Sequence, residues 1–264
     1  MKQLSALALV IFLIAINLTS CDKLRHKEKK PQNKTVVVLC DFSESTRNVG
    51  DVYLRSFKKA ISSIGHGDVI ITAKITDASI TEPEIPVNEA FPEFAPLDKM
   101  GNPTDNPLLV KKAKKEADEG LERKKEDLVK IANYILFAKR DNRKRILHTD
   151  IMSSLHVAEE KAFKNYNRDK AILVILSDMI EDSSEYNFGK ENLADRRIEE
   201  IIKREKTRNR MPDLKGVKVY VVAAGAGGSK RFFTIQNFWF RYFSECGANL
   251  SKENYGSVLM SCDE

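Results

Sequence analysis

The chain has 264 residues, of which 42% are hydrophobic and 31% are charged, and its formal net charge is +6 at pH 7. This composition predicts a globular body with a sizeable core. The 44 basic residues are spread among 38 acidic ones without a patch of interleaved basic and aromatic residues, so we expect no nucleic-acid binding. The four cysteines lack the close spacing of a zinc site.

The first 21 residues have the plan of a secretory signal peptide. A lysine is followed by an apolar stretch from Leu4 to Leu18, and then by small residues and Cys21. The alternative is a membrane-spanning signal anchor, but an apolar stretch of about 15 residues is short for a span. Residues 22–33 are polar and mostly basic, and we interpret them as a flexible tether.

The segment Leu18-Thr19-Ser20-Cys21 resembles the lipobox of bacterial lipoproteins. This resemblance implies that residues 1–20 are removed and that Cys21 becomes a lipid-modified N-terminus. The protein would then be anchored by acyl chains to a bacterial cell membrane, facing the periplasm or the exterior. Residues 21–33 would form the lipid-anchored tether, and residues 34–264 the folded domain.

Four apolar runs rich in β-branched residues predict the strands of a parallel sheet. The run at 35–40 is apolar at every position rather than at alternate ones, and the run at 171–178 is apolar until it ends in Ser177 and Asp178, which is typical of strands buried on both faces. The expected strands are residues 35–40, 69–75, 171–178 and 217–223. Apolar residues at helical spacing predict helices at residues 49–64, 109–140, roughly 192–205 and 231–246, and a further helix that opens at Thr149-Asp150. This order of strands and helices favours an α/β fold.

Two stretches differ from this pattern. Residues 76–109 carry six prolines and little periodicity, so we interpret them as an insertion draped over the surface near the strand ends. Residues 181–215 form a second, polar insertion with one amphipathic helix. In the helix at 109–140 we expect the charged first half to project and Leu128–Ala138 to pack on the sheet. The aromatic residues of 231–246 predict core packing, with a partner-binding face as the alternative.

Two kinds of cysteine follow from these positions. Cys40 lies in a predicted buried strand and is expected to be an inert thiol. Cys246 and Cys262 could pair outside the cytoplasm, although the sequence does not fix the connectivity.

Polar side chains gather where the predicted strands end or where a helix begins. The clusters are Asp41-Phe42-Ser43-Glu44-Ser45, Thr149-Asp150-Ile151 and Ser177-Asp178. Open α/β sheets place their ligand sites at the carboxyl ends of strands. Carboxylate and hydroxyl oxygens suit Mg²⁺, Mn²⁺ or Ca²⁺ rather than zinc or copper. The alternative is that these residues cap the following turns and helices, Thr149 above all.

The three clusters in this order resemble the von Willebrand factor type A (VWA) domain and its metal-ion-dependent adhesion site (MIDAS), over roughly residues 34–250. The family pattern is Asp-x-Ser-x-Ser after the first strand, a threonine in a later loop and an aspartate after the fourth strand. The matching metal-site residues are Asp41, Ser43, Ser45, Thr149 and Asp178. Asp150 is a further candidate just behind these ligands. His148 and Met179 stand where the family often has glycine.

The resemblance implies a doubly wound, mostly parallel sheet flanked by helices, and a site for Mg²⁺ (or Mn²⁺ or Ca²⁺). The hydroxyls would contact the cation and the two aspartates would act partly through water. An open position on the cation would accept an Asp or Glu carboxylate of a protein or peptide partner. We therefore expect a binding module and not an enzyme, since no nucleophile–base pair is evident.

Two alternative functions stay open. One is a metal-dependent phosphohydrolase, although phosphatases of the haloacid type need Asp-x-Asp and this chain has Ser43 at the third position. The other is a degenerate VWA scaffold that binds a partner through its insertions without a metal.

Overall fold

The computed structural model describes residues 33–77, 79–137, 148–166, 168, 170–224, 229–256 and 258–259. The chain divides into two units, Met1–Gln32 and Asn33–Glu264. The first unit lies outside the described residues, and with it lie the predicted signal peptide, the tether and Cys21. Cys262 lies outside them as well. Within the described residues, no helix combines the length and the apolarity needed to cross a membrane.

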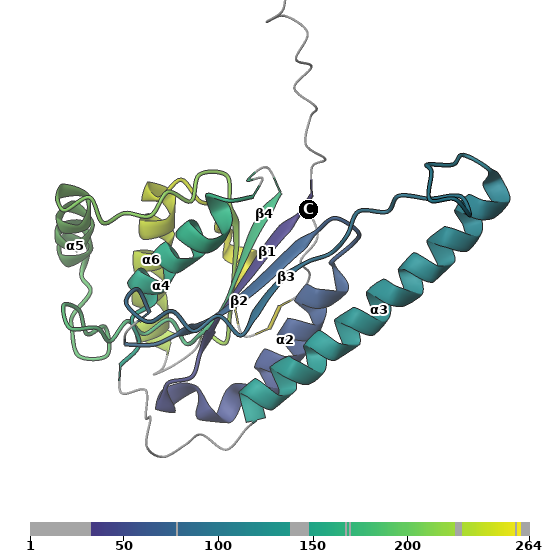
Figure 1. Ribbon diagram of the computed structural model, residues 1–264. Helices are drawn as coiled ribbons and strands as arrows, with labels where there is room; N and C mark the ends of the chain where they lie inside the picture. The colour runs from purple at the N-terminus through teal and green to yellow at the C-terminus, as the bar shows by residue number, and fades with distance from the viewer. Residues whose placement is uncertain are drawn as a thin grey trace, which may run out of the picture. The chain divides into compact units, whose positions relative to one another are not determined.

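Six strands form one sheet in the order β3-β2-β1-β4-β5-β6 (Figure 1). The strands are β1 (Thr35–Asp41), β2 (Val69–Ile75), β3 (Val87–Ala90), β4 (Ala171–Leu176), β5 (Lys218–Val222) and β6 (Tyr255–Gly256). Neighbouring strands are parallel except for β3, which runs antiparallel to β2 at one edge. Every residue of β1 is buried, as its continuous apolar run predicts. The predicted α/β class with a mostly parallel sheet is confirmed.

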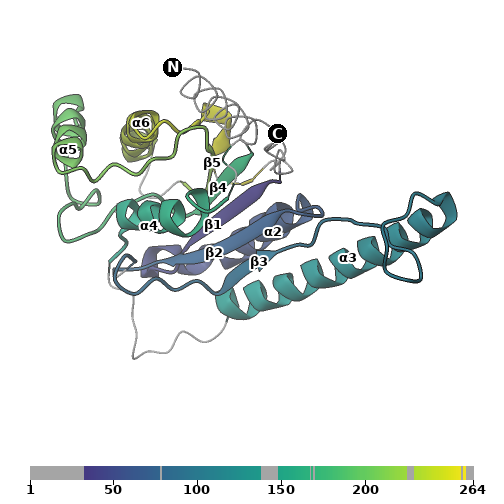
Figure 2. The ribbon, with the colours of Figure 1, turned by 45° about the horizontal axis from the view of Figure 1, so that its top comes forward.

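Helices cover both faces of this sheet. The longer helices are α2 (Gly50–Ser62), α3 (Pro107–Phe137), α4 (Ile151–Ala158), α5 (Asp195–Thr207) and α6 (Ser229–Glu245). Short helical segments follow at Glu44–Val49, Glu159–Phe163 and Lys252–Asn254. Figures 1 and 2 show α2 and α3 on one face, and α4, α5 and α6 on the other. Alternate residues of β1 therefore enter two cores, because successive side chains of a strand point to opposite faces. Val37 and Leu39 pack in the core on the side of α4, α5 and α6, whereas Val36, Val38 and Cys40 pack in the core on the side of α2 and α3.

The prediction that residues 76–109 form an insertion draped over the surface near the strand ends is wrong in part. This stretch contributes β3, whose residues pair with β2 from Val69↔Ala90 to Thr72↔Val87. Val87 and Phe91 are buried against α2 and α3, so the stretch completes one edge of the sheet.

The stretch at 181–215 is the connection between β4 and β5, and α5 lies within it. More of this stretch is buried than its polar sequence predicts. The chain folds back over the core beside α6 before α5 begins, which buries Tyr186, Phe188 and Leu193. The Glu181 side chain is buried as well.

Two predictions about packing are confirmed and a third is confirmed in part. The first half of α3 is largely exposed, and Leu128 and Ala132 in its second half are buried, but Ile131 and Tyr134 are exposed and the side chains of residues 135–138 lie outside the described ones. Trp239 and its aromatic neighbours on α6 lie in the core. Burial raises the pKa of the Cys40 thiol to about 12, so this cysteine stays protonated and unreactive. Cys246 is also a buried free thiol in the described structure.

Candidate metal centre at the carboxyl ends of β1 and β4

The topology brings two of the predicted ligands to one point. β1 and β4 are parallel neighbours, and Cys40 pairs with Leu176 at the end of their ladder. The chain continues from β1 to β2 on one side and from β4 to β5 on the other, so the strand order reverses here. Open α/β sheets bind ligands outside the carboxyl ends of the strands at such a reversal. Asp41 is the last residue of β1, and Asp178 follows the end of β4.

The Asp41 carboxylate is fully buried and holds together the segments around it. Its Oδ1 accepts a hydrogen bond from the Ser43 N–H at 2.8 Å. Its Oδ2 accepts one from the Ser177 hydroxyl, also at 2.8 Å. The Thr46 hydroxyl donates to the Asp41 backbone carbonyl at 2.9 Å. Asp41 therefore fixes the turn after β1 and connects it to the end of β4.

Burial dominates the protonation of Asp41. It raises the pKa of this carboxyl from 3.8 to about 6, although the hydrogen bonds from Ser43 and Ser177 oppose the rise. The nearby charge of Asp178 raises the pKa further. Two carboxylates that share a site of low polarity destabilise each other when both are ionised. A bound cation would remove this penalty.

Asp178 presents an oxygen without a partner. The residue is 8% exposed, and its Oδ1 accepts a hydrogen bond from the Ile180 N–H at 3.0 Å. Its Oδ2 is buried and has no hydrogen-bond partner among the described residues. Burial raises the pKa of Asp178, while the Ile180 N–H and the nearby Ser45 hydroxyl lower it. Buried polar atoms are rarely left unpaired in native proteins, so the free lone pairs of Oδ2 fit a cation or a water bound to one.

The two serines of the first cluster lie close together. Their hydroxyl oxygens are 3.0 Å apart, with Ser43 buried and Ser45 exposed. The helical turn Glu44–Val49 begins directly after Ser43 and contains Ser45, and its Thr46 hydroxyl ties it to the end of β1 by donating to the Asp41 carbonyl. The structure thus gathers Asp41, Ser43, Ser45 and Asp178 at one place, with the hydroxyl of Ser45 as the exposed member.

Thr149 is connected to this group through the backbone. Its N–H donates to the Asp182 carbonyl at 3.0 Å, and the Asp182 N–H donates back to the Thr149 carbonyl at 2.8 Å. These bonds hold Thr149, which is 5% exposed, beside the loop that carries Asp178. In the described part of the chain, no hydrogen bond joins its hydroxyl directly to the other four predicted ligands.

The capping alternative for Thr149 is wrong. The N-cap of α4 is Asp150, whose side chain accepts a hydrogen bond from the Ser153 N–H at 2.9 Å. This contact accounts for Asp150 as a structural cap. The exposed His148 lies 3.2 Å from the Asp182 carboxylate through Nδ1, so the residue before Thr149 also faces the Asp178 loop.

Met179 adopts the conformation for which glycine is suited. Its φ is 65°, in the left-handed region that side chains disfavour. The Met179 N–H donates to the Ser177 hydroxyl at 3.0 Å, and its carbonyl accepts from the Trp239 Nε1 at 2.9 Å. The side chain is fully buried. The strained backbone is thus held by hydrogen bonds on both sides and by core packing.

Sequence reasoning assigned no role to three residues that build this site. Ser177 holds Asp41 in place, and its signal was its position directly before Asp178 at a strand end. Thr46 donates to the carbonyls of Asp41 and Ser43. Glu181 is fully buried beside α4, and nothing in its sequence neighbourhood distinguishes it from a solvated acid.

The donor set determines which cations suit the site. Within the described ranges, no three or more His, Cys, Asp or Glu side chains form a metal-binding group. The predicted ligands instead combine two carboxylates with three hydroxyls. Hard oxygen donors of this kind match Mg²⁺, which also retains water ligands readily.

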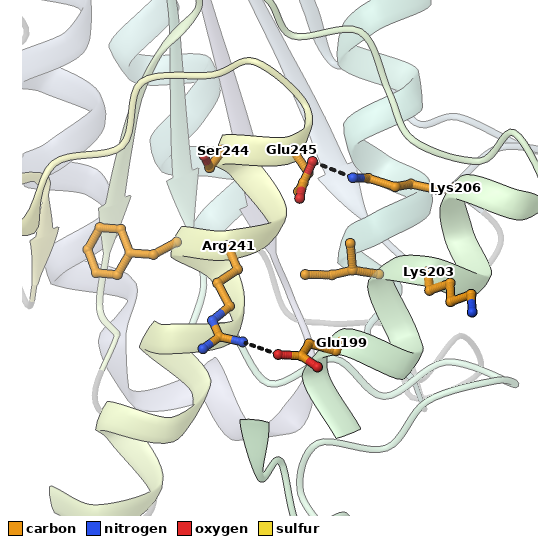
Figure 3. A pocket seen from close by; sticks show the side chains of 8 residues that line it. Glu199, Lys203, Lys206, Arg241, Ser244 and Glu245 are labelled. Atoms are coloured by element: carbon orange, nitrogen blue, oxygen red, sulfur yellow. Dashed lines mark hydrogen bonds and ion pairs between the residues drawn. The ribbon is translucent and has the colours of Figure 1, made fainter. Parts of the chain in front are cut away.

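A cavity of about 690 Å³ lies apart from this centre, between α5 and α6 (Figure 3). Arg241 contacts Glu199 at 3.6 Å, and Lys206 contacts Glu245 at 2.5 Å across it. Shortly after α6, Asn249 bridges to Lys218 at the start of β5. The end of α6 therefore lies near the amino-terminal ends of the strands, whereas the candidate metal centre lies at their carboxyl ends.

No protein-family model matches the sequence, and no curated protein matches it. The structure is similar to proximal thread matrix protein 1 from the mussel byssus, with 17% identity, a TM-score of 0.40 and coverage of 87% of this chain and 44% of that one. It is also similar to the pilus adhesin SpaC from Lactobacillus rhamnosus GG in its open conformation, with 11% identity and a TM-score of 0.42. That match covers 89% of this chain and 29% of the adhesin. The chain thus spans less than half of either protein, and similarities this low do not assign a family.

Proposed function

We propose that this chain is a membrane-anchored bacterial lipoprotein whose VWA-like domain binds a protein or peptide partner through a divalent cation. The observation that carries the proposal is the pair of buried carboxylates at the strand reversal. Asp41 and Asp178 interact there electrostatically, and Asp178 Oδ2 is unpaired. The hydroxyls of Ser43 and Ser45 complete a set of oxygen donors suited to Mg²⁺.

Each residue has a defined part in this proposal. Asp41 and Asp178 provide the negative charge, and Ser177 and the Ser43 N–H orient the Asp41 carboxylate. Ser43, Ser45 and Thr149 offer neutral hydroxyl oxygens, which leave a bound cation electrophilic. The cation would supply the positive charge that attracts an Asp or Glu carboxylate of the partner.

Calorimetry tests the cation site directly. The full-length chain in detergent is titrated with MgCl₂ and MnCl₂, alongside Asp41→Asn and Ser45→Ala. We expect one cation per chain in the wild type and at least about tenfold weaker binding in both variants. Asp51→Asn is the matched control, because Asp51 is exposed in the first turn of α2. Absence of binding in the wild type, or equal affinity in Asp41→Asn, would exclude the metal site.

A peptide array tests the class of partner. In Mn²⁺, we expect bound peptides to carry an Asp or Glu that is essential, so that replacement by Asn or Gln abolishes binding. A chelator should release the same peptides. Binding that survives both the amide replacement and the chelator would favour recognition without a metal.

The membrane anchor rests on the sequence around Cys21, which lies outside the described residues. In a bacterial host, we expect the wild-type chain to fractionate with membranes and to carry the mass of acyl chains at Cys21. Cys21→Ser should lose both properties. Unchanged mass and partitioning in this variant would contradict the lipoprotein interpretation.

A further inference from the structure

Glu181 is a fully buried carboxylate three residues after Asp178. Its Oε2 accepts hydrogen bonds from the Ile151 N–H at 2.8 Å and from the Met152 N–H at 3.2 Å. Its Oε1 is buried without a hydrogen-bond partner among the described residues. Burying a carboxylate costs free energy unless its contacts compensate. The hydrogen bonds to Oε2 therefore explain why a glutamate is buried at this position.

Those contacts are with the first turn of α4. The first N–H groups of a helix have no partner within the helix. Asp150 satisfies the N–H of Ser153 from inside the same segment. Glu181 reaches the N–H groups of Ile151 and Met152 from a segment about thirty residues further along the chain. The start of α4 is therefore completed by a residue of the loop that follows β4.

The same two segments are joined a second time. Thr149 and Asp182 exchange two backbone hydrogen bonds, of 3.0 and 2.8 Å. Together with the two bonds of Glu181, four hydrogen bonds connect residues 149–152 to residues 181–182. We call residues 149–152 the Thr149 segment and residues 177–182 the Asp178 loop. The four hydrogen bonds, referred to below as the bracket, hold these two segments together directly beside the candidate metal centre.

We propose that Glu181 is a positioning residue that fixes the Thr149 segment to the Asp178 loop, so that ligands from both segments are held ready for the cation. The consequence for cation affinity rests on the proposed function, whereas the bracket exists independently of it. Without Glu181, the start of α4 would lose two hydrogen bonds, and Thr149 would have to be ordered again when the cation binds. Preorganised ligands bind more tightly because this ordering cost is removed beforehand.

Two substitutions separate positioning from charge. In Glu181→Gln, the amide oxygen can accept both N–H groups, so the bracket remains and only the ionisable group is lost. In Glu181→Ala, the acceptor is lost altogether. A positioning role therefore predicts that Gln preserves wild-type behaviour and Ala does not. A role of the negative charge in attracting the cation predicts that both variants are impaired.

Glu205 offers a matched control. It is a buried glutamate of α5, 3% exposed, and it accepts hydrogen bonds from Tyr186 and Arg210. Glu205→Ala removes a buried acceptor of the same type, whose hydrogen-bond donors are Tyr186 and Arg210 rather than the first turn of α4. It should lower the thermal midpoint while leaving the Thr149 segment and cation binding unchanged.

The experiment uses the full-length chain and two readouts. Hydrogen exchange in the presence of a chelator should show faster exchange at Ile151, Met152 and Asp182 in Glu181→Ala only. Titration with MnCl₂ should show at least about tenfold weaker binding in Glu181→Ala and unchanged binding in Glu181→Gln and Glu205→Ala.

Unchanged exchange in folded Glu181→Ala, or equal losses of affinity in the Ala and Gln variants, would overturn the positioning role. If Glu181→Ala does not fold, Glu181→Asp replaces it, since the shorter side chain draws the carboxylate away from both N–H groups. Should the wild type bind no Mn²⁺, the proposed function fails, while the exchange data still decide whether Glu181 forms the bracket.

Discussion

The hydroxyl of Ser177 donates a hydrogen bond of 2.8 Å to Oδ2 of Asp41, and the two residues are 136 positions apart. Both are fully buried. The same hydroxyl accepts a hydrogen bond from the Met179 N–H at 3.0 Å. One side chain thus joins the end of β1 to the loop that carries Asp178, and it uses its donor and an acceptor lone pair to do so.

Ser177→Ala is predicted to destabilise the protein by about 1–3 kcal/mol, because it leaves a carboxylate oxygen and an N–H buried without their partner. Urea unfolding followed by circular dichroism measures the change. Ser62→Ala is the control. The exposed Ser62 hydroxyl donates a hydrogen bond to the Lys59 carbonyl, and loss of this hydrogen bond should lower the free energy of unfolding by less than about 0.5 kcal/mol. Equal unfolding midpoints for the wild type and Ser177→Ala would contradict the prediction.

The stability of the cation-free protein should depend on pH through Asp41. Burial raises the pKa of Asp41 from 3.8 to about 6 in the folded chain. The folded state therefore binds this proton more tightly than the unfolded state does. The contribution is fully present below the unfolded pKa and is lost as pH rises through the folded pKa. The free energy of unfolding should fall by roughly 3 kcal/mol between about pH 4 and pH 6 from this group.

The measurement compares the wild type with Asp41→Asn in chelator, by urea unfolding at several pH values across that window. The other titrating groups are present in both proteins, so the difference between the two curves reports Asp41 together with its electrostatic interaction with Asp178. We expect the difference to shift in favour of Asp41→Asn as pH rises. Parallel curves would show that Asp41 does not titrate with a raised pKa.

The sequence was sufficient to predict the centre of the sheet. The run from Val36 to Cys40 is apolar throughout and rich in β-branched residues, which is typical of a strand buried on both faces. A strand of known direction also predicts where its polar ending lies, which is why Asp41 and Asp178 were expected to meet. The predicted α/β class follows from the same local signals.

The edges of the sheet and the bracket beside the site could not be predicted in this way. β3 has four residues with a partly exposed pattern, and β6 has two, so neither leaves a clear periodic signal. The N-cap of α4 is Asp150 rather than Thr149, although both residue types cap helices well. The choice depends on the pairing of Thr149 with Asp182, and the burial of Glu181 depends on the same long-range contact.

Met179 provides a test of backbone strain at the site. A left-handed conformation costs a non-glycine residue roughly 1–2 kcal/mol, and the Met179 side chain is fully buried at a φ of 65°. Met179→Ala removes core packing and keeps the strain, so we expect it to cost about 2–5 kcal/mol. Met179→Gly removes the same packing but relieves the strain, and we expect it to be about 1 kcal/mol more stable than the alanine variant. Urea unfolding of both variants decides this, and an alanine variant more stable than the glycine variant would argue against the strained conformation.

Trp239 provides a test of the connection between α6 and the site. Its indole Nε1–H donates to the Met179 carbonyl at 2.9 Å, and its ring is fully buried among aromatic neighbours. Trp239→Phe keeps an aromatic ring but removes the donor and leaves a small cavity. We therefore expect a loss of about 2–3 kcal/mol in the free energy of unfolding, measured by circular dichroism because this is the chain's only tryptophan.

The same substitution should loosen the loop beside Asp178. Without its donor, the Met179 carbonyl no longer holds the loop against α6, so hydrogen exchange at Met179 and Ile180 should become faster. Phe233→Ala is the control, since Phe233 lies on α6 but is 61% exposed, and its loss should change stability by less than about 0.5 kcal/mol. If Trp239→Phe lowers stability without faster exchange at Met179 and Ile180, Trp239 contributes only to the core. Faster exchange in that loop alone, with the rest of the sheet still protected, would identify the indole as the contact by which the aromatic helix holds Asp178 in place.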